Sequence, residues 1–292
     1  MDAYFRRQKE RIDEILFAQI DRLDTADRLK EAMHYSVQAG GKRIRPILLL
    51  ATMEAFGKNS QSGLPVASAI ELIHTYSLIH DDLPAMDDDD LRRGKPTNHK
   101  IYGEATAILA GDALLTLSFE AVAEIGDADI DGSKKTQLIA MMARAAGAEG
   151  MVGGQCFDLE AERKKLTFEE LEQVHLRKTG KLLAFSIEAG ALLADADEFQ
   201  TNQLRNFAQH LGLAFQIRDD ILDIIGDTNT MGKTAGSDLN KQKSTYPQLL
   251  SLDGAKRKLE EHFIQAKHHL SEAAVDHRRL SALSDYIVNR DV

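Results

Sequence analysis

The sequence predicts an all-α protein, and three features of the chain support this prediction. Apolar residues recur at three- and four-residue spacing along most of the chain, which is the spacing of one face of a helix. No stretch alternates apolar and polar residues with the β-branched enrichment of a half-buried strand. Only five prolines occur among the 292 residues, and all but Pro84 lie beside loops. With no repeat, low-complexity segment or linker, we expect residues 1–292 to form a single domain of ten or more helices.

The expected helices follow one another along the chain. Residues 10–23 carry apolar residues on one face, and residues 28–41 form a second helix that Gly40 and Gly41 end in the usual C-cap role. Residues 44–57 are nearly all apolar, which predicts a buried central helix. The further helices are expected at 64–82, 104–125, 133–149, 168–194 and 196–225, with two more after residue 252.

Composition and charge exclude several classes of protein. The net charge of −10 argues against general nucleic-acid binding, which needs an excess of lysine and arginine. The first residues carry charges throughout and do not resemble a signal peptide, and no run of about 18 apolar residues predicts a membrane span. Cys156 is the only cysteine, so no internal disulfide is expected. These features together predict a cytoplasmic protein.

A cluster of aspartates lies within an otherwise apolar helix, FQIRDDILDIIGD, residues 215–227. Asp219 and Asp223 are four residues apart, about 40° on a helix, so they share one face one turn apart. Like charges at this spacing destabilise a helix, and no lysine is interspersed among them. Carboxylates on so apolar a helix need a cation, which predicts a metal site. An exposed acidic helix edge is the alternative.

A second cluster, LIHDDLPAMDDDDLRRGKP, covers residues 78–96. Asp81 and Asp87 are six residues apart, and an ideal helix would separate them by about 120°. Pro84 lies between them and must break or distort the helix, so we expect Asp87 to turn back and share a cation with Asp81. Hard carboxylate oxygens suit Mg²⁺, which takes one or two protein carboxylates together with phosphate oxygens and water. His80 is the nearest alternative ligand and is interpreted as structural.

Basic residues are concentrated near these clusters although the protein is acidic. GGKRIRP, residues 40–46, lies in a stretch without Asp or Glu between residues 31 and 54. Paired arginines suit bidentate contacts with phosphate, so we expect a polyphosphate held between the carboxylate clusters through metal ions. Each basic stretch taken alone is also consistent with an ordinary surface. The basic residues in question are Lys42, Arg43, Arg45, Arg92, Arg93, Lys95 and Lys233.

These motifs resemble those of the trans-isoprenyl diphosphate synthases. DDLPAMDDDDLRRG is similar to the first aspartate-rich motif of that family in its bacterial form, and DDILD is similar to the second. The similarity spans about residues 35–250, since further motifs occur in family order: GGKRIRP, GGQCFDL, KTGKL, FQIRDD and GKTAGSD with KSTYP. A single DDxxD also occurs in terpene cyclases, whereas two in order with the basic segments are specific to the family.

The resemblance implies a fold and an activity. It implies an all-α domain around a deep central cavity, a homodimer, and a trinuclear Mg²⁺ site at which Mn²⁺ is the other candidate. It further implies that an allylic diphosphate ionises at its C–O bond and that the double bond of isopentenyl diphosphate attacks the allylic cation. Cations at the leaving diphosphate would stabilise the charge that develops there, and apolar walls would exclude water. The released pyrophosphate takes the proton, so no side-chain base is implied.

The resemblance also assigns roles to the residues at its motif positions. The implied metal ligands are Asp81, Asp87 and Asp219, supported directly or through water by Asp82, Asp220 and Asp223. The implied ligands of the allylic diphosphate are Arg92, Lys178 and Lys233. The implied ligands of isopentenyl diphosphate are Lys42, Arg45, His74 and Arg93. The side chains implied to line the reacting carbons are Thr179 and Gln216.

Product length is expected to depend on the helix that precedes the first aspartate cluster. Tyr76 and Ser77 lie five and four residues before Asp81, about one helical turn deeper along the wall of the cavity. In the family that this chain resembles, a bulky residue there acts as a floor that stops the growing tail. Tyr76 therefore predicts the C15 product, farnesyl diphosphate. Plain core packing of Tyr76 is the alternative.

Three other functions are alternatives to this prediction. A synthase of the same family that makes geranyl or geranylgeranyl diphosphate differs only in product length. A terpene cyclase has no isopentenyl site, so Lys42, Arg45 and Arg93 would have no role. A non-catalytic partner subunit would be expected to lose aspartates or arginines of the motifs, and this chain keeps them.

Overall fold

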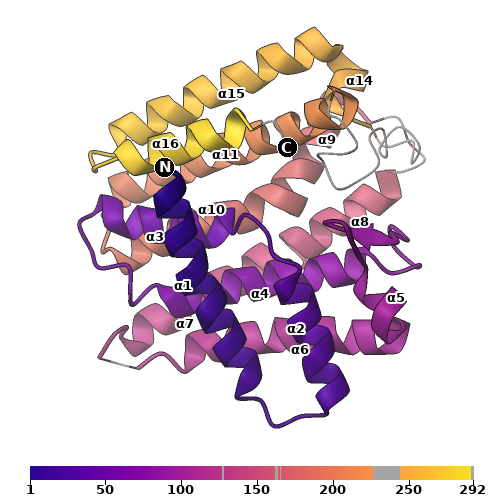
Figure 1. Ribbon diagram of the computed structural model, residues 1–292. Coiled ribbons are helices and arrows are strands. Elements are labelled where there is room, and N and C mark those ends of the chain that lie inside the picture. The colour runs from indigo at the N-terminus through magenta and orange to yellow at the C-terminus, as the bar shows by residue number, and fades with distance from the viewer. Residues whose placement is uncertain (127, 162–163, 165, 226–243, 291–292) are drawn as a thin grey trace. The chain divides into compact units, whose positions relative to one another are not determined.

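The computed structural model describes residues 1–126, 128–161, 164, 166–225 and 244–290, and helices dominate these residues (Figure 1). Contacts divide the chain into two compact units. Unit 1 comprises residues 1–50 and 60–139, and unit 2 comprises residues 51–59 and 140–292. The predicted all-α class is confirmed, because the strands among the described residues amount to one short hairpin. The single domain and the central cavity stay predictions.

Unit 1 is built on α4 (Leu64–Asp81), whose apolar residues surround the helix on all sides and are almost completely buried. α4 packs against three helices of the same unit, and the closest approach is made by α6. Gly111 of α6 permits this approach, because a Cβ there would lie 2.1 Å from Nε2 of His80. The other helices of unit 1 are α1 (Asp2–Asp21), α2 (Asp27–Gln38), α5 (Asn98–Tyr102), α6 (Glu104–Ala123), and the parts of α3 (Ile44–Ala55) and α7 (Gly132–Ala146) up to residues 50 and 139.

Two turns of unit 1 determine where its basic residues lie. α2 ends at Gln38, and Gly40 and Gly41 follow with φ of 82° and 144°, which confirms the predicted glycine C-cap. A hairpin of β1 (Leu91–Arg92) and β2 (Lys95–Pro96) follows the first aspartate cluster. Arg93 and Gly94 join its strands with φ of 54° and 74°, as a two-residue turn of type I′ requires.

Unit 2 is built around the long helix α11, which packs against α10 and α15. Its buried face includes Leu204, Phe207 and Leu211, which recur at helical spacing. The elements of unit 2 are α8 (Met151–Ala161), α9 (Phe168–His175), the π-helix η1 (Leu176–Gly180), α10 (Lys181–Leu193), α11 (Glu198–Ile225), α14 (Tyr246–Leu250), α15 (Leu252–Glu272), α16 (Arg278–Val288), and the remaining parts of α3 and α7.

The structure differs from the predicted elements in four places. The first helix, expected over residues 10–23, begins earlier and spans Asp2–Asp21. The single helix expected at 168–194 is divided by η1 into α9 and α10. α8 was not expected, because Gly153 and Gly154 lower the helix propensity of its sequence. The short elements α5, α14, β1 and β2 span too few residues to show a periodic pattern. The predicted buried helix is confirmed, since residues 47–51 of α3 are fully buried.

α6 is long and apolar enough to span a membrane by length and composition, and 44% of its most apolar window is buried inside the protein. One face of this helix packs in the core of unit 1, and the other face is exposed. It packs against α2 and α4, and Glu120 and Glu124 on its last turns pair with Arg22 of α1.

Candidate active site

The first aspartate cluster begins where α4 ends. Asp81 is the last residue of α4, and Pro84 lies in the turn that follows. The backbone then returns, because the N–H of Asp87 donates to the carbonyl of Asp81 at 2.9 Å and the N–H of Asp88 donates to that of Leu83 at 3.1 Å. Pro84 thus follows a helix end instead of bulging a continuing helix, and Asp87 is returned to Asp81 as predicted. Both aspartates are partly exposed.

Asp82, next to Asp81, is buried and paired with an arginine. Its Oδ1 accepts from Nε of Arg92 at 2.6 Å and also from Nη2. Asp89 accepts from the same guanidinium at 3.2 Å. Burial alone would lower the pKa of Arg92, but its hydrogen bonds with Asp82 and the charges of Asp82, Asp89 and Asp81 raise it. Arg92 is therefore held beside the cluster in a fixed direction.

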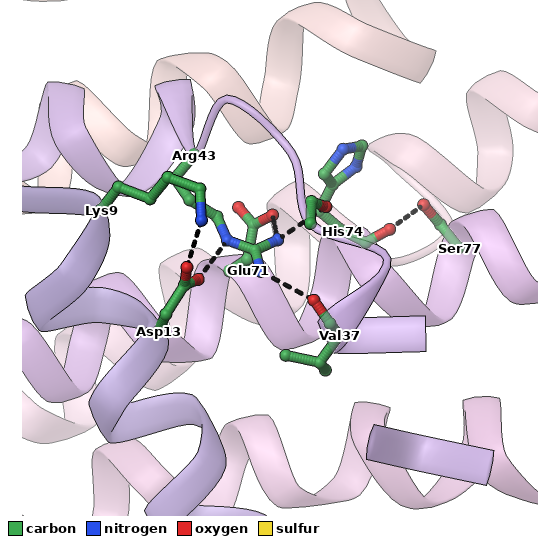
Figure 2. Close-up of polar contacts among 8 residues, drawn as sticks. Lys9, Asp13, Val37, Arg43, Glu71, His74 and Ser77 are labelled. Atoms are coloured by element: carbon green, nitrogen blue, oxygen red, sulfur yellow. Dashed lines mark hydrogen bonds and ion pairs between the residues drawn. The ribbon is translucent and has the colours of Figure 1, made fainter. Parts of the chain in front are cut away.

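His74 lies on α4 one turn after Glu71 (Figure 2). The charges of four arginines act on its side chain. Desolvation lowers the pKa of His74 well below its ordinary value, and the charges of Arg45, Arg93, Arg43 and Arg92 lower it further. His74 is therefore neutral near pH 7. Arg93 reaches this group by packing on Gly41, where a Cβ would lie 2.8 Å from its guanidinium. The arrangement is a local concentration of positive charge in an acidic protein.

The residues predicted to limit product length also lie on α4. Tyr76 is 5% exposed, and its ring meets that of His80 edge-on with centroids 5.6 Å apart. Burial, and to a smaller extent Asp81, raise the pKa of Tyr76 to about 12, so its hydroxyl is neutral. The hydroxyl of Ser77 donates to the carbonyl of His74 at 3.0 Å.

In unit 2, η1 presents Lys178 and Thr179. Nζ of Lys178 pairs with Asp158 of α8 at 2.6 Å. α8 approaches η1 at Gly154, where a Cβ would lie 2.2 Å from the backbone N of Lys178. The glycines of the GGQCFDL motif therefore have a physical reason, which is contact between two backbones. π-helical turns often mark functional sites.

A chain of hydrogen bonds leads from Thr179 to the second aspartate cluster on α11. The hydroxyl of Thr179 donates to Oε1 of Gln216 at 3.1 Å, and Nε2 of Gln216 donates to Asp220 at 3.1 Å. The other carboxylate oxygen of Asp220 accepts from the backbone N–H of Tyr246 at 3.0 Å. Asp220 is only 3% exposed. Its carboxylate therefore fixes Gln216 and the start of α14.

Asp219 and Asp223 are the more accessible aspartates of this cluster. The side chain of Asp219 is 42% exposed and pairs with the guanidinium of Arg290, which lies 4.0 Å above the ring of Phe215. Asp223 is half-buried one turn further along α11. Lys233, expected to bind the allylic diphosphate, lies outside the described residues.

The side chains near the two aspartate clusters are next compared with what the predicted metal ion needs. Among the described residues, no three His, Cys, Asp or Glu side chains converge on one point. Pairs of carboxylates are nevertheless available within each unit, Asp81 with Asp87 and Asp219 with Asp223. Mg²⁺ needs no more than one or two carboxylates when phosphate oxygens and water complete its coordination. The donor set therefore fits Mg²⁺, with the ligand assignment remaining a prediction.

Sequence reasoning missed the acidic partners of the basic residues. Asp158, Asp89 and Glu71 each bind a cation of the predicted site. The sequence did indicate Asp158 as a candidate site residue, because it lies inside the GGQCFDL motif. Glu71 carried no comparable signal, because it is a single charge in an apolar helix.

Comparisons with known proteins agree with these features. Residues 26–278 match the polyprenyl synthetase family. The chain is 56% identical to farnesyl diphosphate synthase of Geobacillus stearothermophilus, over 100% of this chain and 98% of that protein. It is 52% identical to farnesyl diphosphate synthase of Bacillus subtilis with the same coverage. A crystal structure of a putative farnesyl-diphosphate synthase from Marinomonas sp. MED121 superposes with a TM-score of 0.85, at 38% identity and covering 99% of both chains.

Proposed function

The chain belongs to the polyprenyl synthetase family, and from this premise we propose that it is a prenyltransferase that makes farnesyl diphosphate. It condenses isopentenyl diphosphate with dimethylallyl diphosphate, and then with geranyl diphosphate, by 1′–4 coupling. The observation that carries the proposal is the set of cations around His74, in addition to the two aspartate clusters. A cyclase, which takes one diphosphate substrate, has no use for this second group.

Lys42 and two of the arginines near His74 are proposed to bind isopentenyl diphosphate, whereas Arg92 is assigned to the allylic diphosphate. Lys42, Arg45 and Arg93 supply positive charge for the diphosphate, and the forked guanidinium groups suit bidentate contacts with its oxygens. A neutral His74 is able to donate one hydrogen bond without adding further charge to a group of four arginines. Isopentenyl diphosphate does not ionise in the reaction, so these residues have to bind and orient it only.

The allylic diphosphate is proposed to lie against Arg92 and Lys178, with Lys233 as a third cation. As the C–O bond breaks, negative charge grows on the leaving diphosphate, and cations already in place stabilise that charge more than the ground state. Asp82 and Asp158 hold the first two cations in fixed directions, which reduces the reorganisation needed at the moment of ionisation. Thr179 and Gln216 are proposed to line the reacting carbons.

Mg²⁺ is proposed to be held by Asp81, Asp87 and Asp219, with support from Asp82, Asp220 and Asp223. When bound, it supplies Lewis-acid stabilisation of the leaving diphosphate. Asp82 and Asp220 are the two buried members of the set and are already bonded to Arg92, Gln216 and Tyr246. We therefore assign them to orientation of the site. No side chain has to act as the base, because the departing pyrophosphate accepts the proton.

A homodimer is proposed through α6. Ile108 and Leu109 on this helix are 43% and 58% exposed, and Ala105, Asp112 and Thr116 extend the same face at helical spacing. A largely apolar face of small and branched residues suits a second copy of the same chain. A cytoplasmic location agrees with the single free cysteine.

The test is incubation with isopentenyl and dimethylallyl diphosphates and Mg²⁺, followed by chromatographic sizing of the dephosphorylated products. Farnesol is the expected product. Asp81→Ala and Asp219→Ala are each expected to lower turnover by about two orders of magnitude or more, since each removes a carboxylate from the metal site, without lowering the melting temperature by more than a few degrees. A cyclic hydrocarbon, or no reaction by the folded wild-type protein, would overturn the proposal.

A further inference from the structure

Arg43 lies between the two basic residues of the GGKRIRP segment that face the predicted isopentenyl site, yet it is itself only 2% exposed. Its backbone has φ of 50°, in the left-handed region that a side chain without special support avoids. In this conformation the side chain of Arg43 lies inside unit 1.

The guanidinium of Arg43 is bonded at all three nitrogens (Figure 2). Nε donates to Asp13 of α1 at 2.8 Å, and Nη1 donates to Glu71 of α4 at 2.7 Å. Nη2 donates to the carbonyl of Val37 in the last turn of α2 at 2.9 Å, and Nη1 also donates to that of Gly40 at 3.2 Å. One side chain therefore joins three helices to the loop that contains it.

The charges around Arg43 are balanced. Glu71 and Asp13 each carry one negative charge, and Lys9 pairs with Asp13. Two cations thus face two anions, so that the buried guanidinium is compensated. Burial lowers the pKa of Arg43, but the charges and hydrogen bonds of Glu71 and Asp13 raise it above its ordinary value. Arg43 stays charged, and its displacement would take a hydrogen-bonded cation away from the buried Glu71 and leave Lys9 as the ion-pair partner of Asp13.

Glu71 links this network to the rest of the basic group. It lies three residues before His74 on α4, so both side chains lie on neighbouring parts of one helical face. Desolvation of its guanidinium lowers the pKa of Arg93, and the charges of Arg43, Arg92 and Arg45 lower it further. The charge of Glu71 raises this pKa. Glu71 therefore offsets repulsion among arginines that are gathered in one place.

We infer that Arg43, with Glu71 and Asp13, is a positioning residue for isopentenyl diphosphate. It does not touch the substrate, and it fixes the backbone from which Lys42 and Arg45 extend. The inference rests on the proposed function of these two residues. Its consequence is specific to one substrate, because the network holds the loop that contains Lys42 and Arg45. The cations assigned to the allylic diphosphate have other anchors, Asp82 for Arg92 and Asp158 for Lys178.

The experiment compares steady-state kinetics for both substrates in Glu71→Gln, Asp13→Asn and Arg43→Lys. Glu71→Gln and Asp13→Asn keep the shape of the acceptor and remove its charge. Glu120→Gln is the control, because it removes one carboxylate from an exposed ion pair of unit 1. Circular dichroism melting identifies the variants that remain folded at the assay temperature.

We expect KM for isopentenyl diphosphate to rise about tenfold in Glu71→Gln and Arg43→Lys, with KM for the allylic diphosphate and kcat changed less than about threefold. Asp13→Asn should give a smaller effect in the same direction, and the control should give none. Folded variants with unchanged KM for isopentenyl diphosphate would overturn the inference, as would equal changes for both substrates. A wild-type protein that condenses neither substrate would instead overturn the proposed function.

Discussion

Replacing Tyr76 by alanine is expected to lengthen the product. Tyr76 precedes Asp81 by five residues on α4, which places the two Cα atoms about 7.5 Å apart along the helix axis. A prenyl tail that extends from a diphosphate near Asp81 along α4 therefore meets the Tyr76 ring. The ring is buried and neutral, and it meets the His80 ring edge-on, so we expect it to act as an apolar stop.

The expected magnitudes follow from this environment. Truncation of a buried aromatic residue to alanine destabilises a protein by about 3–5 kcal/mol, and the lost ring contact with His80 is part of that amount. A bound longer tail should recover some of the loss by filling the space. Removing the stop should also raise the ratio of C20 to C15 product at least about tenfold, which corresponds to about 1.4 kcal/mol between the two barriers.

The assay is product sizing at a fixed ratio of the two substrates, with a thermal melt of each variant. Tyr76→Phe is the matched control, because it keeps the ring and should keep C15 as the main product. A folded, active Tyr76→Ala variant whose product profile equals that of the wild type would refute the idea of a floor and leave Tyr76 as ordinary core packing.

Three further predictions use other contacts. The His80 ring lies 3.1 Å from the carbonyl of Ile108 on α6, at hydrogen-bond distance. Gly111→Ala would place a methyl group 2.1 Å from this ring and should displace it, which removes the hydrogen bond at a loss of about 1 kcal/mol in unfolding free energy. Longer products are then expected in the sizing assay, and an unchanged product profile would show that His80 does not support Tyr76. Asp158→Asn removes the ion-pair partner of Lys178. It should raise KM for the allylic diphosphate by roughly 2–10 times, while KM for isopentenyl diphosphate stays constant. A rise in KM for isopentenyl diphosphate alone would contradict the assignment of Lys178 to the allylic substrate. Burial lowers the pKa values of His210 and His262 to about 4, below the value of about 6.5 in the unfolded chain. Both side chains are therefore neutral in the folded protein, and the unfolded chain binds more protons between these two values, so the free energy of unfolding falls as the pH falls from about 6.5 towards 4. A melting temperature that is constant over this interval would contradict the prediction.

The helices were predictable wherever apolar residues repeat over several turns. α1, α2, α6 and α11 all have one strongly apolar face or an apolar interior, and their approximate positions were correct. Prediction failed where local propensity opposed the outcome. α8 contains adjacent glycines that are unfavourable in a helix, and it forms because the missing Cβ at Gly154 allows contact with η1.

The candidate site was predictable to the extent that its charges are arranged locally. The return of Asp87 to Asp81 follows from the position of Pro84, and both residues are close in sequence. The direction of Arg43 was not predictable, because it depends on Asp13 and Glu71, which come from distant parts of the chain. Sequence spacing also does not show that Lys178 and Asp158 meet, since they lie 20 residues apart on two separate elements, η1 and α8.

The hairpin of β1 and β2 has a consequence for how the protein tolerates insertions. Arg92 is the last residue of β1 and binds Asp82, whereas Arg93 begins the turn and packs on Gly41. Arg92 is extended, whereas Arg93 has a positive φ in the turn, so two identical side chains adjacent in the sequence contact different parts of unit 1. One uncharged residue inserted between Asp88 and Leu91 would move both arginines relative to Asp82 and Gly41. The length of this short stretch therefore matters as much as its composition, because such an insertion would alter the site without removing a charged group.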